Sequence, residues 1–122
     1  MGSLVRGIRG AITVERNDAQ EIIEATRELL RELVQSNQLE EEDICSVFFT
    51  VTKDLDTAFP ARAARSLGWQ FVPLLCAQEL DVVGSLPRCI RVLLHVNTDK
   101  AQQEIKHIYL RNAVGLRPDL AD

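Results

Sequence analysis

The stretch that decides the fold runs from residue 88 to residue 96, Arg88-Cys89-Ile90-Arg91-Val92-Leu93-Leu94-His95-Val96. Its apolar and β-branched residues predict a mostly buried β-strand. Arg91 interrupts this run, and a guanidinium group cannot lose its proton to ease burial. Because dehydrating an ion costs several kcal/mol, Arg91 needs an anionic partner from the protein, from a ligand or from both.

Two further stretches place charged residues within apolar sequence. Glu79 closes the largely apolar stretch 72–79, and Arg6 and Arg9 punctuate a strand-like stretch at 5–14. An isolated arginine in a β-strand more often lies at the edge of the sheet, where its aliphatic chain extends along the surface and its guanidinium group reaches water. The functional interpretation is stronger for Arg91, because apolar residues follow it directly. Several arginines and one glutamate on a small sheet predict a pocket for a small, multiply charged anion.

Composition predicts one domain over residues 1–122, with 46% hydrophobic and 26% charged residues. A net charge of −4 without a basic face argues against a nucleic-acid partner. Since no apolar run could span a membrane and no secretory signal is present, we expect no membrane partner. Cys45, Cys76 and Cys89 form no disulfide or zinc pattern, which predicts a reduced, cytoplasmic protein. Residues 1–3 have the composition of an expression-vector remnant.

The local patterns predict the order β-α-β-α-β-β-α, with strands at 5–14, 44–52, 69–75 and 88–96. Helices are expected from the Asp18 cap to Asn37, from Pro60 to Gly68, and from Thr98 or Asp99 to about Ala113, before a C-terminal tail at 115–122. The order predicts an α+β fold in which helices pack on one face of a mixed β-sheet. Because both faces of the second and fourth strands are apolar, we expect identical subunits to bury the other face.

Other site types find little support in the sequence. Gly7-x-x-Gly10 lacks the lysine of a P-loop and the third glycine of a dinucleotide-binding loop. His95 and His107 have no partners at metal-ligand spacing, so no metal site is expected. Cys76 has no context for a Cys-His pair and, taken alone, reads as a pocket wall or a core residue.

Seven short motifs follow one another along the chain: Arg6-Gly7-Ile8-Arg9-Gly10-Ala11, Phe59-Pro60-Ala61, Val72-Pro73, Cys76-Ala77-Gln78-Glu79, Cys89-Ile90-Arg91-Val92, His107-x-Tyr109-Leu110 and Leu116-Arg117-Pro118-Asp119. Together they closely resemble the monofunctional chorismate mutases of the small trimeric AroH class, from Val5 to Leu120. The resemblance implies a homotrimer with a pseudo-α/β-barrel core and active sites between subunits. It also implies that chorismate rearranges to prephenate, in phenylalanine and tyrosine biosynthesis, without a cofactor or metal.

The same resemblance implies a role for each matching residue. Arg91 would donate to the ether oxygen of the substrate, Glu79 would accept from its ring hydroxyl, and Arg9 would bind its side-chain carboxylate. The other matching positions are substrate-binding: Leu75, Tyr109 at the same carboxylate, Cys76 as a polar wall, Phe59 and Leu116 as apolar walls, Arg62 and Arg65 near the entrance, and Arg117 on a closing tail. Arg62 stands where some relatives have lysine, which keeps the charge and changes the geometry.

A different class of function remains open as an alternative. A non-catalytic trimer could bind a small carboxylate metabolite in an intersubunit cleft, and RidA-type proteins also place an arginine there. Those proteins lack the pairing of Glu79 with Arg91, which favours the mutase. A purely structural oligomerisation module does not account for so many basic residues within apolar sequence.

Overall fold

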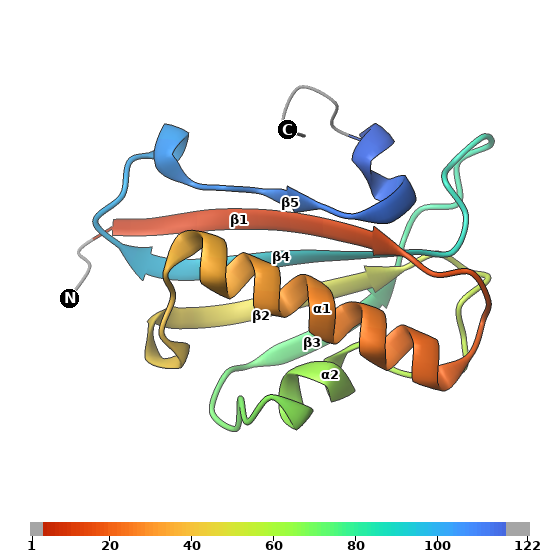
Figure 1. Cartoon of the computed structure of the whole chain (residues 1–122), viewed down its shortest axis with the longest axis horizontal. Coiled ribbons are helices and arrows are strands. Elements are labelled where there is room, and N and C mark those ends of the chain that lie inside the picture. The colour runs from red at the N-terminus through yellow and green to blue at the C-terminus, as the bar shows by residue number, and fades with distance from the viewer. Residues whose placement is uncertain (1–3, 117–122) are drawn as a thin grey trace.

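The structure of the protein, a computed structural model, describes residues 4–116. One sheet with strand order β3-β2-β4-β1-β5 is covered on one face by two helices (Figure 1). The elements are β1 (Leu4–Thr13), α1 (Ala19–Asn37), β2 (Ile44–Val51), α2 (Ala61–Ser66), β3 (Leu74–Gln78), β4 (Cys89–Thr98) and β5 (Ile108–Tyr109). β4 pairs antiparallel with β1 and β2, while β3 joins β2 and β5 joins β1 in parallel. The predicted α+β fold with a mixed sheet is confirmed.

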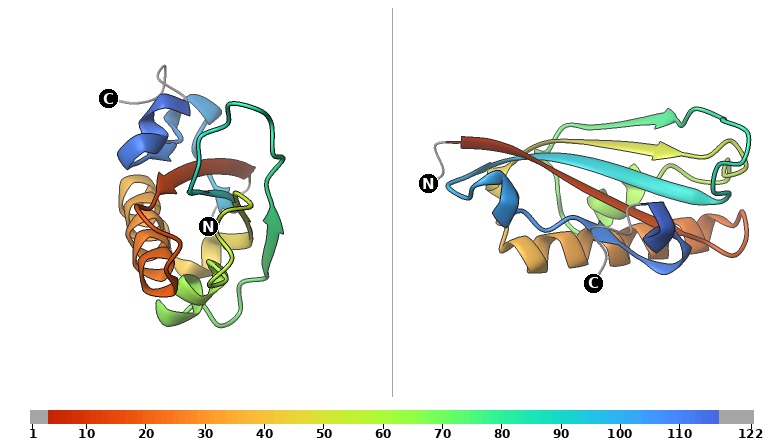
Figure 2. Two further views of the ribbon diagram at one scale, coloured as in Figure 1. Left: turned by 90° about the vertical axis from the view of Figure 1, so that its right-hand side faces the viewer. Right: turned by 90° about the horizontal axis from the view of Figure 1, so that it is seen from above.

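The long helix α1 forms where its caps and apolar spacing predict it. The Asp18 carboxylate accepts a hydrogen bond from Glu21 N at 3.0 Å, which satisfies one of the free amides at the helix start. After Asn37 the chain leaves the helix through Gln38, whose φ of 55° is left-handed. The further views in Figure 2 show α1 running along one side of the sheet.

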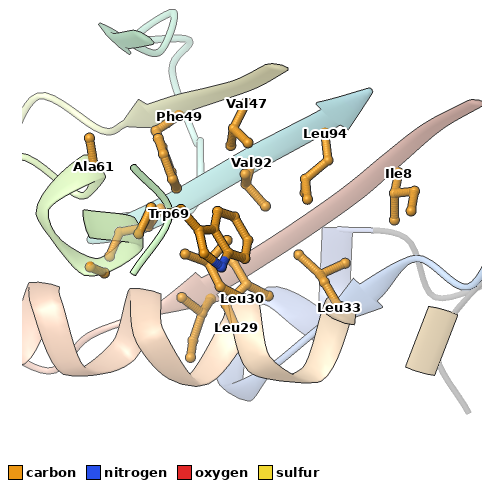
Figure 3. Packing of buried hydrophobic residues seen from close by; sticks show 14 of the residues in the cluster. Ile8, Leu29, Leu30, Leu33, Val47, Phe49, Ala61, Trp69, Val92 and Leu94 are labelled. Atoms are coloured by element: carbon orange, nitrogen blue, oxygen red, sulfur yellow. The ribbon is translucent and has the colours of Figure 1, made fainter. Parts of the chain in front are cut away.

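The hydrophobic core lies between the helices and the sheet (Figure 3). Leu29, Leu30 and Leu33 of α1 pack against alternate strand residues, which include Ile8, Ile12, Val47, Phe49, Val92 and Leu94. Gly10 allows this approach, because a Cβ atom there would lie 3.1 Å from the Cδ1 atoms of both Leu29 and Leu33. Strand alternation therefore directs one face of β1, β2 and β4 to the core and turns the other face away from the helices.

The third predicted strand, 69–75, is misplaced along the sequence. The strand begins at Leu74, and its first ladder bond is donated by Val47 N to Pro73 O. Trp69 and Val72 are buried, each 7% exposed, from an irregular segment that follows Gly68. Their apolar pattern reflects loop residues that fill the core, so the sequence pattern alone placed the strand too early.

The predicted last helix, from about 98 to 113, is wrong. The segment holds two short 3₁₀ turns, Gln102–Glu104 and Arg111–Leu116, on either side of β5. Asn37 binds both backbone groups of Lys106, and Leu110 N donates to Ala11 O. These long-range partners take up backbone groups that a helix would have paired locally. Of the predicted tail, residues 117–122 lie outside the described residues.

The sheet face opposite the helices carries exposed apolar side chains. Val5, Phe48 and Leu75 are 59%, 41% and 58% exposed, and Leu93 lies among them, half-buried. Phe48 meets the His95 ring edge-on, with ring centroids 6.0 Å apart. We call this surface the open face. Within residues 4–116, no helix has the length and apolar character needed to cross a membrane.

Candidate active site

Strand register places the central candidate residues in one row across the open face. Arg91 on β4 pairs with Ala11 on β1 and with Thr50 on β2, and Ala11 pairs with Tyr109 on β5. Paired residues on neighbouring strands project to the same face of a sheet. Arg91 therefore stands at the middle of the sheet, with Tyr109 on one side and Thr50 on the other.

Arg91 has the protein carboxylate that its apolar context predicts. Its Nε lies 3.7 Å from Glu79 Oε2, and the two side chains are 36% and 28% exposed. This separation is longer than a hydrogen bond, so the pair is a loose electrostatic contact. Glu79 is instead held by other donors: Thr50 Oγ1 donates to Oε2 at 2.9 Å, and Leu80 N donates to Oε1 at 3.2 Å.

Cys89 lies two residues before Arg91 and therefore on the same face of β4. Burial raises the pKa of its thiol, and the nearby Arg91 guanidinium only partly opposes that shift. The thiol is thus neutral at physiological pH, so it can contact Arg91 without taking the place of an anionic ligand. Sequence reasoning missed Cys89 as a site residue, although strand alternation was a signal that could have found it.

Tyr109 brings a buried hydroxyl to the same region. The residue is 7% exposed and packs with Ala11, Cys89 and Ala113, against which Leu116 is partly buried. Its hydroxyl is the buried side-chain polar atom that finds no hydrogen-bond partner within the described chain. Such a group costs about 1–3 kcal/mol when it stays unsatisfied. A ligand with an acceptor oxygen would relieve that cost.

Arg9 extends this group along β1. It pairs with Leu93 and so projects from the open face, two residues from Ala11. Its backbone N donates to His107 Nδ1 at 3.0 Å, and both residues line a hollow of about 350 Å³. His107 lies half-buried directly before β5, and not on the helix predicted for this segment. Arg9, Glu79, Arg91, Tyr109 and Leu116 are called the open-face group below.

A second set of candidate residues gathers elsewhere. Phe59, Arg62 and Cys76 line a cleft of about 430 Å³ at the edge strand β3 and the start of α2. Cys76 pairs with the core residue Phe49 and therefore projects to the helix side of the sheet. Phe59 is 69% exposed at this cleft. We call these three residues the cleft group.

The remaining predicted residues lie apart from both groups. Arg65 lines a different hollow, with Trp69 and Leu74, while Leu75 is exposed on the open face beside Phe48. Arg117 lies outside the described residues. The structure thus brings most of the predicted site residues into two groups on opposite faces of one sheet, and within one chain it does not bring them together in a single pocket. Among residues 4–116, no three acidic, histidine or cysteine side chains are placed to hold a metal ion.

The chain is similar to known proteins over nearly its whole length. Residues 5–120 match the family model described as chorismate mutase type I. Chorismate mutase AroH of Thermus thermophilus is 56% identical over 118 residues, which cover 96% of this chain and 97% of that protein. The Bacillus subtilis AroH is 48% identical over 119 residues, covering 97% and 94%.

A solved structure is similar to this chain in both fold and sequence. The chorismate mutase from Clostridium thermocellum superimposes with a TM-score of 0.88 at 57% identity, over 88% of this chain and 96% of that chain. Matches of this length and identity cover both groups of candidate residues. The chain belongs to the type I chorismate mutase family.

Proposed function

We propose that the protein is a chorismate mutase that rearranges chorismate to prephenate with Arg91 and Glu79 at the reacting bonds. Family membership supports the reaction. The observation that carries the assignment of residues is the loose Arg91–Glu79 pair, 3.7 Å apart, beside the unpartnered Tyr109 hydroxyl. This arrangement offers a cation, an acceptor and a free donor to one small ligand.

The reaction is an intramolecular rearrangement in which one carbon–oxygen bond breaks while one carbon–carbon bond forms. No proton has to move and no covalent intermediate is needed, so the protein's task is to hold a compact conformer and stabilise developing charge. Arg91 donates to the ether oxygen, where negative charge grows. Donors placed at such a position are worth about 2.7–4 kcal/mol each.

The other open-face residues orient the substrate. Glu79 accepts a hydrogen bond from the ring hydroxyl and faces the electron-poor part of the ring. Arg9 and Tyr109 bind the side-chain carboxylate, and Tyr109 gains the partner that its hydroxyl lacks in the free chain. Leu116 closes the apolar side of this region. None of these roles uses a metal or a cofactor.

The two groups of residues support a site shared between copies of the chain. One small substrate cannot touch both faces of the same sheet, yet the cleft group faces the helix side and the open-face group the other side. We therefore infer that the cleft group of one copy, Phe59, Arg62 and Cys76, covers the open-face group of its neighbour. Arg65, on α2 with Arg62, would line the entrance, and Arg117 the closing tail. A homotrimer repeats this contact in a closed ring and covers the apolar open face.

We also propose that the protein works in the cytoplasm. All three cysteines are free thiols, and Cys45 is exposed. Persistent free thiols fit a reducing compartment better than an oxidising one.

The test of function is the rate of chorismate loss, followed by ultraviolet absorbance with purified protein in EDTA. Rapid loss with prephenate as sole product is expected. Saturable binding without turnover would replace this proposal with the non-catalytic carboxylate-binding trimer.

The test of the shared site mixes two inactive variants. Arg91→Ala removes the open-face donor, and Arg62→Ala together with Cys76→Ala alters the cleft. When the two variants are coexpressed, some sites combine two intact groups, so activity should return. Mixtures as inactive as either parent would contradict the shared site.

A further inference from the structure

Thr50 is a half-buried residue of β2 that lies directly beside Arg91 in the sheet register. Its hydroxyl donates to Glu79 Oε2 at 2.9 Å, the same oxygen that faces Arg91 Nε at 3.7 Å. The other oxygen, Oε1, accepts from Leu80 N at 3.2 Å. Each oxygen of this carboxylate therefore has a donor other than Arg91.

A carboxylate that has no other donor prefers a closer geometry with a guanidinium group than the one observed between Glu79 and Arg91. Side by side, they form two parallel hydrogen bonds at about 2.7–2.9 Å, which occupy the donors of the arginine. An arginine bound in that way has fewer donors left for a substrate oxygen. The observed pair is longer than a hydrogen bond and involves Nε, so it does not have this closed geometry.

We propose that Thr50 is a positioning residue that holds the Glu79 carboxylate away from Arg91, so that the Arg91 donors stay available for the substrate. This inference rests on the proposed function and adds to it a residue that need not touch the substrate. The hydroxyl acts as a competing donor: it satisfies Oε2 and so removes the advantage of a closer approach to Arg91. Leu80 N fixes Oε1 and limits rotation of the carboxylate about its last bond.

The matched variants at this position are Thr50→Val and Thr50→Ser. Valine keeps the shape and the strand preference of threonine but lacks the donor, whereas serine keeps the donor. In Thr50→Val the carboxylate is expected to close onto Arg91. Turnover should then fall by about 10-fold, a factor in the range of a lost hydrogen bond to a charged group, with KM changed by less than about threefold. Thr50→Ser should retain kcat within about twofold of the unmodified protein.

A double-mutant cycle separates positioning from a direct role. If Thr50 acts through Glu79, adding Thr50→Val to Glu79→Gln should cost nothing further, because the neutral amide does not form the closed ion pair. Equal losses from Thr50→Val in both backgrounds would overturn the proposal. So would a Thr50→Ser variant as slow as Thr50→Val, since serine keeps the hydroxyl.

The ligand-free crystal structure of Thr50→Val tests the geometry independently of turnover. Glu79 Oε2, which has lost its Thr50 donor, should lie within hydrogen-bond distance of Arg91, and an unmoved Oε2 would overturn the positioning role. Where valine prevents folding, Thr50→Ala removes the same donor and serves in both experiments. Failure of the proposed function is recognised separately, because then the unmodified protein would not convert chorismate at all.

Discussion

Replacing Arg91 with lysine separates positive charge from geometry at the centre of the open face. Arg91→Lys keeps the charge near Glu79 but replaces a planar group with several fixed donors by a compact ammonium group. Loss of one placed donor at the developing oxyanion should cost about 2.7–4 kcal/mol, and so lower kcat by about 100- to 1,000-fold. Because the side chain is 36% exposed and its ion pair is 3.7 Å long, stability should change by less than about 1 kcal/mol.

The assay for this variant is chorismate loss under saturating substrate, with urea unfolding of the same preparation as the check on folding. The matched control is Arg31→Lys on the exposed side of α1, which should leave both kcat and the unfolding midpoint unchanged. An Arg91→Lys enzyme within about threefold of normal turnover would refute the reasoning, because a point charge would then suffice. A large loss of stability would instead assign Arg91 a structural role.

Four further outcomes follow from individual contacts. Tyr109→Phe should leave the free energy of unfolding unchanged or raised, because the hydroxyl is unpartnered in the free chain, while steady-state kinetics show KM for chorismate about 10-fold higher. Asn37→Ala removes side-chain bonds to the backbone of Lys106 in the C-terminal segment and of Leu33 in its own helix, and should cost about 2–3 kcal/mol in urea unfolding. Gly10→Ala should cost about 1–3 kcal/mol in the same measurement, because its Cβ would lie 3.1 Å from Ile108 O. Burial raises the pKa of Cys89, so its stabilising contribution is complete at neutral pH and is lost as pH rises past the ordinary thiol range; Cys89→Ala should flatten the alkaline limb of a stability–pH curve.

Local periodicity predicts much of the fold. The helix from Asp18 to Asn37 and the strand around Arg91 were predicted because each has a strong repeat and clear boundary residues. The C-terminal segment was mispredicted because Ile105, Ile108 and Tyr109 also fit a helical spacing. Its true structure depends on Asn37 and on β1, which are far away in sequence, and local propensity does not contain that information.

The residues of the candidate site could likewise be predicted only in part from the sequence. Arg91 and Glu79 could be predicted because a charge in apolar sequence needs a partner. Thr50 could not, since its place beside Arg91 depends on the register between β2 and β4. Cys76 and Glu79 lie three positions apart on an extended segment, an odd spacing that sends them to opposite faces. That spacing is visible in the sequence, whereas the family resemblance alone does not say which copy of the chain supplies each residue.

The division of the site between two faces of one sheet has a consequence for inheritance. In the proposed assembly each chain contributes to two different sites, one through its open face and one through its cleft. A mutant chain with a defect on one face would disable one site of a mixed assembly, whereas a chain with defects on both faces would disable two. Cells that carry one normal and one mutant gene would then lose more activity when both faces are damaged, though less than twice as much, because some sites receive both defects from two mutant chains. The doubly defective allele would be the more dominant.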